Sequence, residues 1–590
     1  MENHIEGEII RISGPVVQAK NMLGARLYDV ARIGTQGLIG EIIQVEKDVA
    51  TIQCYEVTDG IHPGEPVVGT GEPLSVMLGL GIMSQIYDGI QRPLPAIKEE
   101  TGAFIHRGVE TPALNMTKEW DFEVTVKVGD EVTGGDTIAT VQETPSYLHK
   151  VMVPPKLSGK VLEVTDSGKY NIQKVLAVIE DQNAEKHELK GYHLWPVRVP
   201  RPIKKRLNSD EPLVTGQRIF DTFFPIAKGG VAAIPGPFGT GKTVSQHQLA
   251  KYSDAQIVVY VGCGERGNEM TDVLEVFPEL DDPRSGEKLM ARTTMIANTS
   301  NMPVAAREAS VYTGVTMAEY FRDQGYDVAM MADSTSRWAE AMREISGRLE
   351  EMPGEAGYPA YLASKIAAYY ERGGRARLIG NEDRTGSVSI IGAVSPPGGD
   401  FSEPVTQNTL RIVKAFWALT KKLAEQRHFP AISYLDSYTL YWDVLKDYYK
   451  KHFSEDFEEL RTKAFKLLQE DNELQEIVQL VGPDALPPAE RITLEAARIL
   501  KEDFLQQNAF HEVDSFCSPE KQAIMLRNIF DVYEKMKELF AAGVELSDIM
   551  EKEIFDRLPR MKYESDVTNL KKLGEDIHAL DISMFKIISI

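Results

Sequence analysis

The chain contains the sequence Gly236-Pro237-Phe238-Gly239-Thr240-Gly241-Lys242-Thr243, which matches the eight-residue pattern of a P-loop, a glycine-rich turn that binds phosphate groups. An apolar segment, residues 231–234, precedes the turn, and a segment that can start a helix, residues 243–251, follows it. Glycines let backbone N–H groups converge on phosphate oxygens, and a helix N-terminus adds partial positive charge. This context predicts a phosphate site; a turn that binds nothing is the simpler alternative.

Several side chains of this region have expected roles. Lys242 can reach the β- and γ-phosphates, and the Thr243 hydroxyl can ligate Mg²⁺. The predicted nucleotide-binding residues here are Gly236, Pro237, Phe238, Gly239, Thr240, Gly241, Lys242, Thr243 and Val244.

A second apolar segment supplies a carboxylate for the metal. Residues 328–332 are apolar and Asp333 follows them directly. In P-loop enzymes a carboxylate at the end of a neighbouring strand holds the water shell of Mg²⁺, so Asp333 and Thr243 are the predicted metal residues. Taken alone, Asp333 could instead cap the helix that the next residues can start.

A third apolar segment, residues 256–261, leads into Gly262-Cys263-Gly264-Glu265-Arg266. Charged side chains at such a strand end can project into the crevice where α/β sheets bind ligands. Glu265 is predicted to activate the attacking water and Arg266 to stabilise charge on the γ-phosphoryl group. The predicted catalytic residues are therefore Lys242, Glu265 and Arg266, whereas a structural Glu–Arg ion pair is the alternative.

Composition limits the possible partners. The chain has 590 residues, with 65 Lys and Arg against 88 Asp and Glu, and a net charge of −23. The electric field of a negative net charge repels the phosphate backbones of nucleic acids, so we expect no nucleic acid partner. The three cysteines lie far apart and form neither a metal spacing nor a disulfide framework. No segment approaches the ~18–20 unbroken apolar residues of a membrane helix.

The pattern of the chain predicts a multidomain fold. Short β segments separated by glycine turns predict an N-terminal β-barrel in residues 1–75, followed by a connector, residues 76–110. A second β-rich part, residues 111–188, resembles a biotinyl/lipoyl-type barrel sandwich inserted as a bulge. Residues 189–435 alternate apolar strands with helical periodicity, which indicates an α/β domain with a mostly parallel sheet. Residues 436–590 predict a C-terminal α-helical domain.

The inserted β part could in principle be a carrier domain. Such domains present a modifiable lysine on a tight hairpin, and Lys150 is the nearest candidate in the sequence. Its surroundings lack that hairpin, so a structural bulge is the favoured interpretation.

Longer strings beyond these motifs resemble a known family. Residues 236–243, 261–272, 298–308, 331–340 and 395–400 look like the catalytic A subunit of rotary V-type/A-type ATPases. The similarity extends over nearly the whole chain, and the inserted β part is itself a mark of this subunit. Eukaryotic members carry cysteine where this chain has Thr240, so the resemblance is to the bacterial or archaeal kind.

The resemblance implies that the central domain is RecA-like and that the chain binds ATP or ADP with Mg²⁺. Lys242, Thr243 and Asp333 match the phosphate-binding lysine, the Mg²⁺ ligand and the strand-end aspartate of the family. Glu265 matches the glutamate that activates water, and Arg266 the arginine beside it. The aromatic positions that flank adenine match Phe429, Phe510 and Phe516. Three core phenylalanines are the alternative for these last positions.

The resemblance also implies partners. The family forms a ring in which three A subunits alternate with three B subunits, and the B subunit is the expected source of a further catalytic arginine. Central stalk subunits turn as ATP is hydrolysed or synthesised, peripheral stalk subunits hold the ring, and a membrane rotor moves ions. The chain would then lie at the cytoplasmic face, peripheral to the membrane through the complex.

Other functions would show different residues. A non-catalytic ring subunit would lack the lysine–threonine pair or the water-activating carboxylate, and a type III export ATPase would lack the insert at residues 111–188. A Rho-like RNA translocase would carry a basic N-terminal domain. A binding-only or scaffold protein remains an alternative of a different class.

Overall fold

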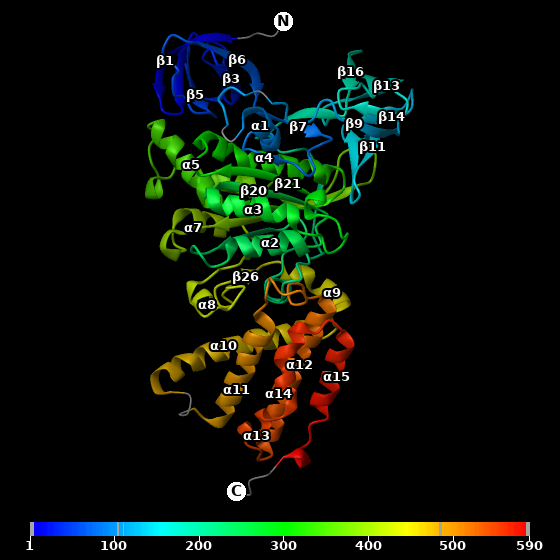
Figure 1. Cartoon of the computed structure of the whole chain (residues 1–590), viewed down its shortest axis with the longest axis vertical. Coiled ribbons are helices and arrows are strands. Elements are labelled where there is room, and N and C mark those ends of the chain that lie inside the picture. The colour runs from blue at the N-terminus through cyan, green and yellow to red at the C-terminus, as the bar shows by residue number, and fades with distance from the viewer. Residues whose placement is uncertain (1–4, 103–104, 110, 483–485, 586–590) are drawn as a thin grey trace.

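The computed structural model describes residues 5–102, 105–109, 111–482 and 486–585. The molecule is elongated, with a barrel and a β-rich bulge side by side at one end, an α/β layer in the middle and helices at the other end (Figure 1). This order of β-barrel, inserted β domain, α/β domain and helical domain confirms the predicted fold class. The boundaries predicted between these parts stay predictions.

The N-terminal barrel is closed, with strand order β1-β2-β5-β4-β3-β6. Alternate side chains of these short strands point inward and bury a small separate core that includes Ile9, Ile33 and Ile52. The strands are β1 (Ile5–Ser13), β2 (Val16–Lys20), β3 (Asp29–Ile33), β4 (Leu38–Glu46), β5 (Val49–Cys54) and β6 (Pro66–Pro73).

A connector and the bulge follow. The connector contains β7 (Ser75–Gly79), β8 (Ile86–Tyr87) and α1 (Leu94–Thr101). The bulge has two four-stranded sheets, ordered β10-β13-β15-β16 and β12-β11-β9-β14. Lys150 lies within β12 and its Nζ donates to the Gln324 carbonyl oxygen at 2.9 Å, so it is not presented as a carrier lysine. The strands are β9 (Glu119–Val124), β10 (Glu131–Thr133), β11 (Thr137–Thr144), β12 (Tyr147–Met152), β13 (Ser158–Val164), β14 (Gly168–Asn171), β15 (Ala177–Glu180) and β16 (Lys186–Leu189).

The central domain is built on a ten-stranded sheet whose main path is β26-β25-β19-β24-β22-β20-β21-β8. The strands from β19 to β8 along this path are parallel, so the carboxyl ends of β19, β22 and β20 lie at the same edge of the sheet. Besides β8, its strands are β18 (Lys205–Leu207), β19 (Val231–Pro235), β20 (Ile257–Glu265), β21 (Thr293–Thr299), β22 (Asp327–Asp333), β23 (Gly374–Arg377), β24 (Thr385–Val394), β25 (Ala415–Phe416) and β26 (Tyr438–Thr439). β17 (Tyr192–Pro196) pairs with β7 in a separate two-stranded sheet.

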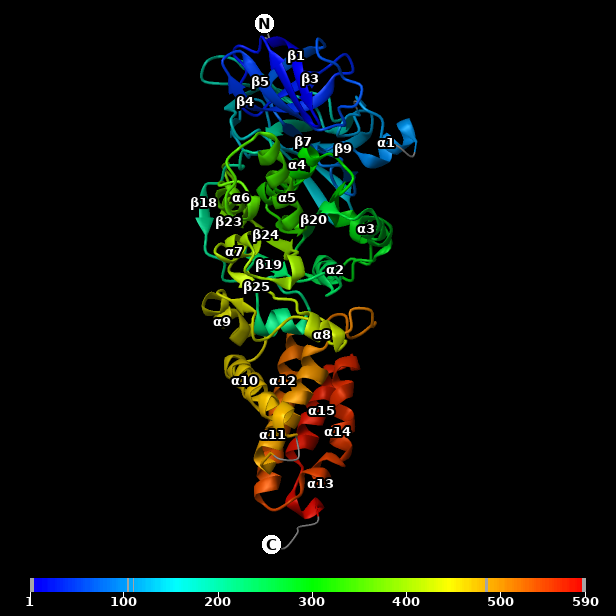
Figure 2. The same ribbon diagram turned by 90° about the vertical axis from the view of Figure 1, so that its left-hand side faces the viewer.

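Helices cover both faces of this sheet, and α4 is buried over most of its length (Figure 2). The helical elements are η1 (Ile219–Phe223), α2 (Lys242–Tyr252), α3 (Gly267–Glu279), η2 (Leu289–Arg292), α4 (Val304–Asp323), α5 (Thr335–Arg348), η3 (Glu355–Gly357), α6 (Leu362–Tyr370), η4 (Pro397–Gly399), α7 (Pro404–Leu410) and α8 (Lys421–Glu425).

The C-terminal domain is helical. Its apolar faces join the core on one side of the central sheet into a single buried cluster, through contacts such as that of Phe223 with Phe465. Its helices are α9 (Trp442–His452), α10 (Phe457–Val481), α11 (Pro488–Ile499), η6 (Leu500–Leu505), α12 (Pro519–Ala541), α13 (Leu546–Met550), α14 (Glu553–Arg557), η7 (Leu558–Tyr563), α15 (Val567–His578) and η8 (Ile582–Met584).

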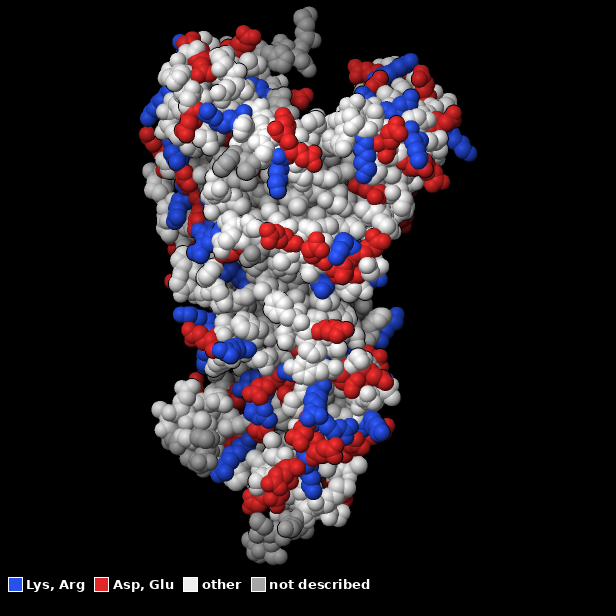
Figure 3. Space-filling model, viewed as in Figure 1, with Lys and Arg blue, Asp and Glu red and all other residues white. Residues whose placement is uncertain are grey.

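Two surface properties bear on partners. Within the described ranges, no helix combines the length and apolar character needed to cross a membrane. On the face shown in Figure 3, acidic and basic side chains are interspersed over all parts of the molecule.

Candidate functional site

The P-loop connects β19 to α2, as predicted. Gly239 and Gly241 have φ angles of 78° and 90°, a left-handed conformation that side chains rarely adopt. A Cβ on Gly236 would lie 2.5 Å from the Leu419 Cβ, so this position also requires glycine. Inside the turn, the Thr240 hydroxyl donates to the Pro237 carbonyl oxygen at 2.7 Å. The sequence thus fixes the turn by conformation and by space.

Lys242 is the first residue of α2, and its side chain reaches back to the P-loop. Its Nζ donates to the carbonyl oxygens of Gly236 and Pro237, at 2.7 and 3.1 Å. Burial lowers the pKa of Lys242, and the carboxylates of Asp333, Glu265 and Glu269 act in the opposite direction. These carboxylates therefore share the electrostatic environment of Lys242.

Thr243 and Asp333, the two predicted metal residues, are in contact. The Thr243 hydroxyl donates to Asp333 Oδ2 at 3.2 Å, and the buried Tyr260 hydroxyl donates to the same oxygen at 3.3 Å. Burial, and next the nearby charge of Glu265, raises the pKa of Asp333 to about 7. A hydroxyl and a carboxylate are oxygen ligands that suit Mg²⁺, and a divalent cation would favour the ionised carboxylate.

Glu265 and Arg266 stand at the carboxyl end of β20, next to the N-terminus of α3. Burial, and next the charge of Glu265, raises the pKa of Glu269 in the first turn of α3. The Arg266 guanidinium lies 4.7 Å from the centre of the Phe238 ring, over the P-loop. No ion pair joins Glu265 to Arg266 in the described part of the chain, in contrast to the structural alternative for these two residues.

A cavity of about 520 Å³ begins at the P-loop and extends to the helical domain. Both domains contribute to its wall, so a bound molecule would contact both. It is lined by Gln217, Phe220, Gly239, Thr240, Gly241, Val244, Ser245, Gln248, Arg427, Phe429, Pro430, Gln506, Gln507, Asn508, Ala509, Phe510, Asp514, Lys562 and Tyr563.

The structure brings part of the predicted set to this cavity. Of the predicted nucleotide-binding residues, those in the cavity wall are Gly239, Thr240, Gly241, Val244, Phe429 and Phe510, and those outside it are Gly236, Pro237, Phe238, Lys242, Thr243 and Phe516. Phe429 and Phe510 are 41% and 86% exposed, so they are not core phenylalanines. Phe516 stacks on Tyr252 with ring centroids 5.7 Å apart and packs closely against Gly216.

Most polar side chains of the cavity wall were not predicted from the sequence. Gln506 and Asn508 lie a few residues before Phe510, so their position in the sequence offered a signal. Gln217, Lys562 and Tyr563 come from distant segments that carry no motif, and nothing local pointed to them.

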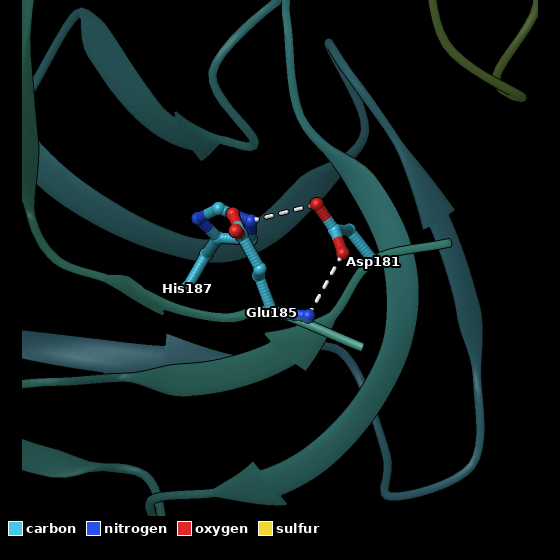
Figure 4. Close-up of side chains that lie close together, drawn as sticks. All are labelled: Asp181, Glu185 and His187. Carbon is cyan, nitrogen blue, oxygen red and sulfur yellow. Dashed lines mark hydrogen bonds and ion pairs between the residues drawn. The ribbon is translucent and has the colours of Figure 1, made fainter. Parts of the chain in front are cut away.

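Among the residues that the structure describes, one other group of side chains could hold a metal ion. Asp181, Glu185 and His187 lie together on the β15–β16 hairpin of the bulge (Figure 4). Asp181 Oδ1 accepts from the backbone N–H groups of Asn183 and Glu185 at 2.9 and 3.0 Å, and Asp181 Oδ2 lies 3.1 Å from His187 Nε2. These contacts stabilise the hairpin turn, and the group belongs to a different domain from the P-loop.

Family models match four parts of the chain in order. The β-barrel domain of the ATP synthase alpha/beta family matches residues 9–71, and the barrel-sandwich domain of the ATP synthase alpha/beta subunits matches residues 111–198. The nucleotide-binding domain of the alpha/beta family matches residues 216–439, and the C-terminal domain of V and A type ATP synthase matches residues 446–549.

Comparisons of this chain with individual proteins lead to the same family. The assembled ATPase EscN from the type III secretion system of enteropathogenic E. coli is 20% identical, with a TM-score of 0.64 over 89% of this chain and 99% of EscN, which shows a shared fold. The A subunit of the A-type ATP synthase of Desulfurococcus is 59% identical over 98% of this chain and 99% of that protein. The A subunit of the A-type ATP synthase of Methanopyrus kandleri is 61% identical over 95% of each chain. The chain therefore belongs to the family of A subunits of A-type ATP synthases.

Proposed function

We propose that this chain is the catalytic subunit of a rotary ATPase, which couples the hydrolysis or synthesis of Mg-ATP to rotation of a central stalk and to ion transport. One observation carries the chemical part of this proposal. The Thr243 hydroxyl, next to Lys242 at the start of α2, donates to Asp333 Oδ2 at 3.2 Å, and Glu265 ends the neighbouring strand β20, so that the charges of both carboxylates act on the Lys242 ammonium. A phosphate-binding cation, a metal ligand and a candidate base thus lie in one place.

The reaction is in-line transfer of the γ-phosphoryl group to water. Lys242 and the backbone N–H groups of the P-loop bind the phosphates, and Glu265 orients the attacking water and favours loss of its proton. Thr243 and Asp333 would hold Mg²⁺, which when bound neutralises charge on the β- and γ-phosphates. Arg266 supplies positive charge to the γ-phosphoryl group as negative charge develops there.

The cavity next to the P-loop is the proposed site of the adenosine part. Phe429 and Phe510 offer aromatic faces, one on each domain, between which a base can stack. Phe516 lies outside the wall, so we propose that it supports the neighbouring Gly216 and Tyr252 and does not itself stack on the base.

The proposed assembly is the alternating ring of three A and three B subunits, with central and peripheral stalk subunits and an indirect connection to a membrane rotor. In this arrangement the chain acts at the cytoplasmic face of the membrane. The nucleotide site between two domains supports such a role, because binding that favours one arrangement of the domains can be converted into motion.

The decisive test uses a ring reconstituted with the B subunit. Glu265→Gln keeps the size of the side chain but removes the base, so the ring should bind ATP and lose Mg²⁺-dependent turnover; Lys242→Ala should lose turnover as well. Glu275→Gln, an exposed position on α3, is the matched control and should keep full turnover. Steady-state hydrolysis by the Glu265→Gln ring would remove Glu265 from the catalytic role.

A further inference from the structure

The wall of the cavity opposite the P-loop comes from the segment between η6 and α12, residues 506–518. This wall segment contributes Gln506, Gln507, Asn508, Ala509, Phe510 and Asp514 to the cavity. It belongs to the helical domain in sequence, yet hydrogen bonds and an ion pair hold it against η1 of the central domain. Figure 2 shows the boundary between these two domains.

Arg218, directly before η1, is the centre of this contact. Its side chain is fully buried and forms an ion pair with Asp514, with 2.8 Å between Arg218 Nη1 and Asp514 Oδ1. Its Nη2 donates to the Gln506 carbonyl oxygen at 2.9 Å, and its Nε donates to the Phe504 carbonyl oxygen. One guanidinium thus holds both ends of the part of the wall that bears Phe510.

Further hydrogen bonds join the same two segments. The Arg218 backbone N–H donates to Gln507 Oε1 at 2.8 Å, and Gln507 Nε2 donates to the Gly216 carbonyl oxygen at 2.9 Å. Gln217 Nε2 donates to the Ser515 carbonyl oxygen at 2.7 Å. Within the wall, the Asn508 backbone N–H donates to Asp514 Oδ2 at 2.6 Å, so the carboxylate that pairs with Arg218 also shapes the turn before Phe510.

This geometry depends on the guanidinium. Its planar fork donates to two carbonyl oxygens and at the same time forms an ion pair with a carboxylate, which a lysine ammonium cannot reproduce from the same position. Arg218 does not line the cavity itself, so it can act on a bound molecule only through the wall.

We propose that Arg218 is a positioning residue, which fixes the adenosine-side wall of the cavity to the domain that carries the P-loop. The base subsite and the phosphate subsite are thereby held at a constant separation. The proposal rests on the proposed function only in that the ligand of the cavity is an adenine nucleotide.

The test compares two ligands on the full-length chain. Arg218→Lys should weaken ATP binding, measured by titration calorimetry, by about tenfold or more, which corresponds to about 1.4 kcal/mol. Binding of inorganic tripolyphosphate, which lacks a base, should not change, because the P-loop is untouched. In the ring reconstituted with the B subunit, the same substitution should raise the KM for ATP far more than it lowers kcat.

Arg372→Lys is the matched control. Arg372 is also buried, pairs with Glu319 at 2.5 Å and donates to the Val197 carbonyl oxygen at 2.7 Å, but it lies outside the cavity wall. This variant should lose stability as Arg218→Lys does and keep its affinity for ATP. If Arg218→Lys does not fold, Arg218→Gln, which keeps a neutral donor at a position outside the cavity wall, should show the same selective loss.

The outcomes separate the two hypotheses. Equal weakening of the binding of ATP and tripolyphosphate, or unchanged ATP affinity in a folded Arg218→Lys or Arg218→Gln chain, would overturn the positioning role. An unsubstituted chain that binds tripolyphosphate but not ATP would overturn both this role and the nucleotide assignment. Loss of ATP affinity in Arg372→Lys would show that any buried arginine matters equally, and would also overturn it.

Discussion

At the scale of single residues, Phe510 is the most informative side chain of the cavity. Its ring is 86% exposed, so replacing it should change the stability of the fold little. Stacking of a base on an aromatic ring contributes about 1–3 kcal/mol, so Phe510→Leu should weaken ATP binding by about tenfold. Titration calorimetry measures the affinity, and Phe510→Tyr, which keeps an aromatic face, should restore it.

Leu480→Ala provides the control for this prediction. Leu480 is 85% exposed and lies on α10, outside the cavity wall, so its loss should leave the affinity for ATP as it is. If Phe510→Leu also keeps the affinity of the unsubstituted chain, the base does not stack on Phe510.

The same scale shows what sequence can predict about a site. Lys242 and Thr243 follow from a local pattern, and Asp333 from an apolar segment that ends in a carboxylate; the structure brings Thr243 and Asp333 into contact. Gln217 and Lys562 also line the cavity, but they reach it through the packing of two domains. Because no spacing along the chain records that packing, these residues could not be predicted.

At the scale of elements, α2 illustrates how burial makes stability depend on pH. His247 on α2 packs between the rings of Tyr260 and Phe277, and its Nε2 is buried without a hydrogen-bond partner. Burial lowers the pKa of His247 from its ordinary 6.5 to about 4. Between these pH values the unfolded chain binds more protons than the folded chain, so the free energy of unfolding falls as the pH falls from 6.5 to 4.

His247→Phe should therefore reduce this loss, because a phenylalanine ring fits among the same aromatic neighbours and does not take up a proton. Denaturant unfolding at pH 7 and pH 5 measures the difference, which should be smaller in the variant than in the unsubstituted chain. The control is His62→Gln, at an exposed position of the barrel domain. Between pH 7 and pH 5 its free energy of unfolding should fall by as much as that of the unsubstituted chain. An equal loss in His247→Phe would mean that other groups cause the acid sensitivity.

Elements also differ in how far sequence predicts them. The apolar segments around residues 231–234, 256–261 and 327–333 identify three strands, which form β19, β20 and β22. The order of these strands in the sheet could not be predicted in the same way, since β24, from residues 385–394, lies between β19 and β22. Strand order depends on how helices cross the sheet, and hydrophobic periodicity does not record it.

At the scale of the whole molecule, the charges around Glu265 bear on whether the chain can act alone. P-loop ATPases commonly use an additional arginine at the γ-phosphate, which contributes about 10³–10⁵ in rate. Apart from Arg266, which already has a role in the proposed mechanism, the guanidinium groups near Glu265 have other partners in this chain. Arg337 pairs with Glu340 at 2.8 Å, and Arg307 donates to the Ser300 carbonyl oxygen at 2.8 Å.

We therefore expect the isolated chain to bind ATP but to hydrolyse it at least about 10³-fold more slowly than the proposed ring, in which a neighbouring subunit would supply the additional arginine. Mg²⁺-dependent phosphate release should be measured for the chain alone, for the B subunit alone and for the mixture, with native mass spectrometry to confirm the ring. A mixture made with the Lys242→Ala chain should assemble and stay inactive, which locates the activity in this chain. If the chain alone turned over as fast as the ring, all catalytic groups would have to lie within it, and Arg337 would be the first candidate, because its partly exposed side chain lies within electrostatic reach of Glu265.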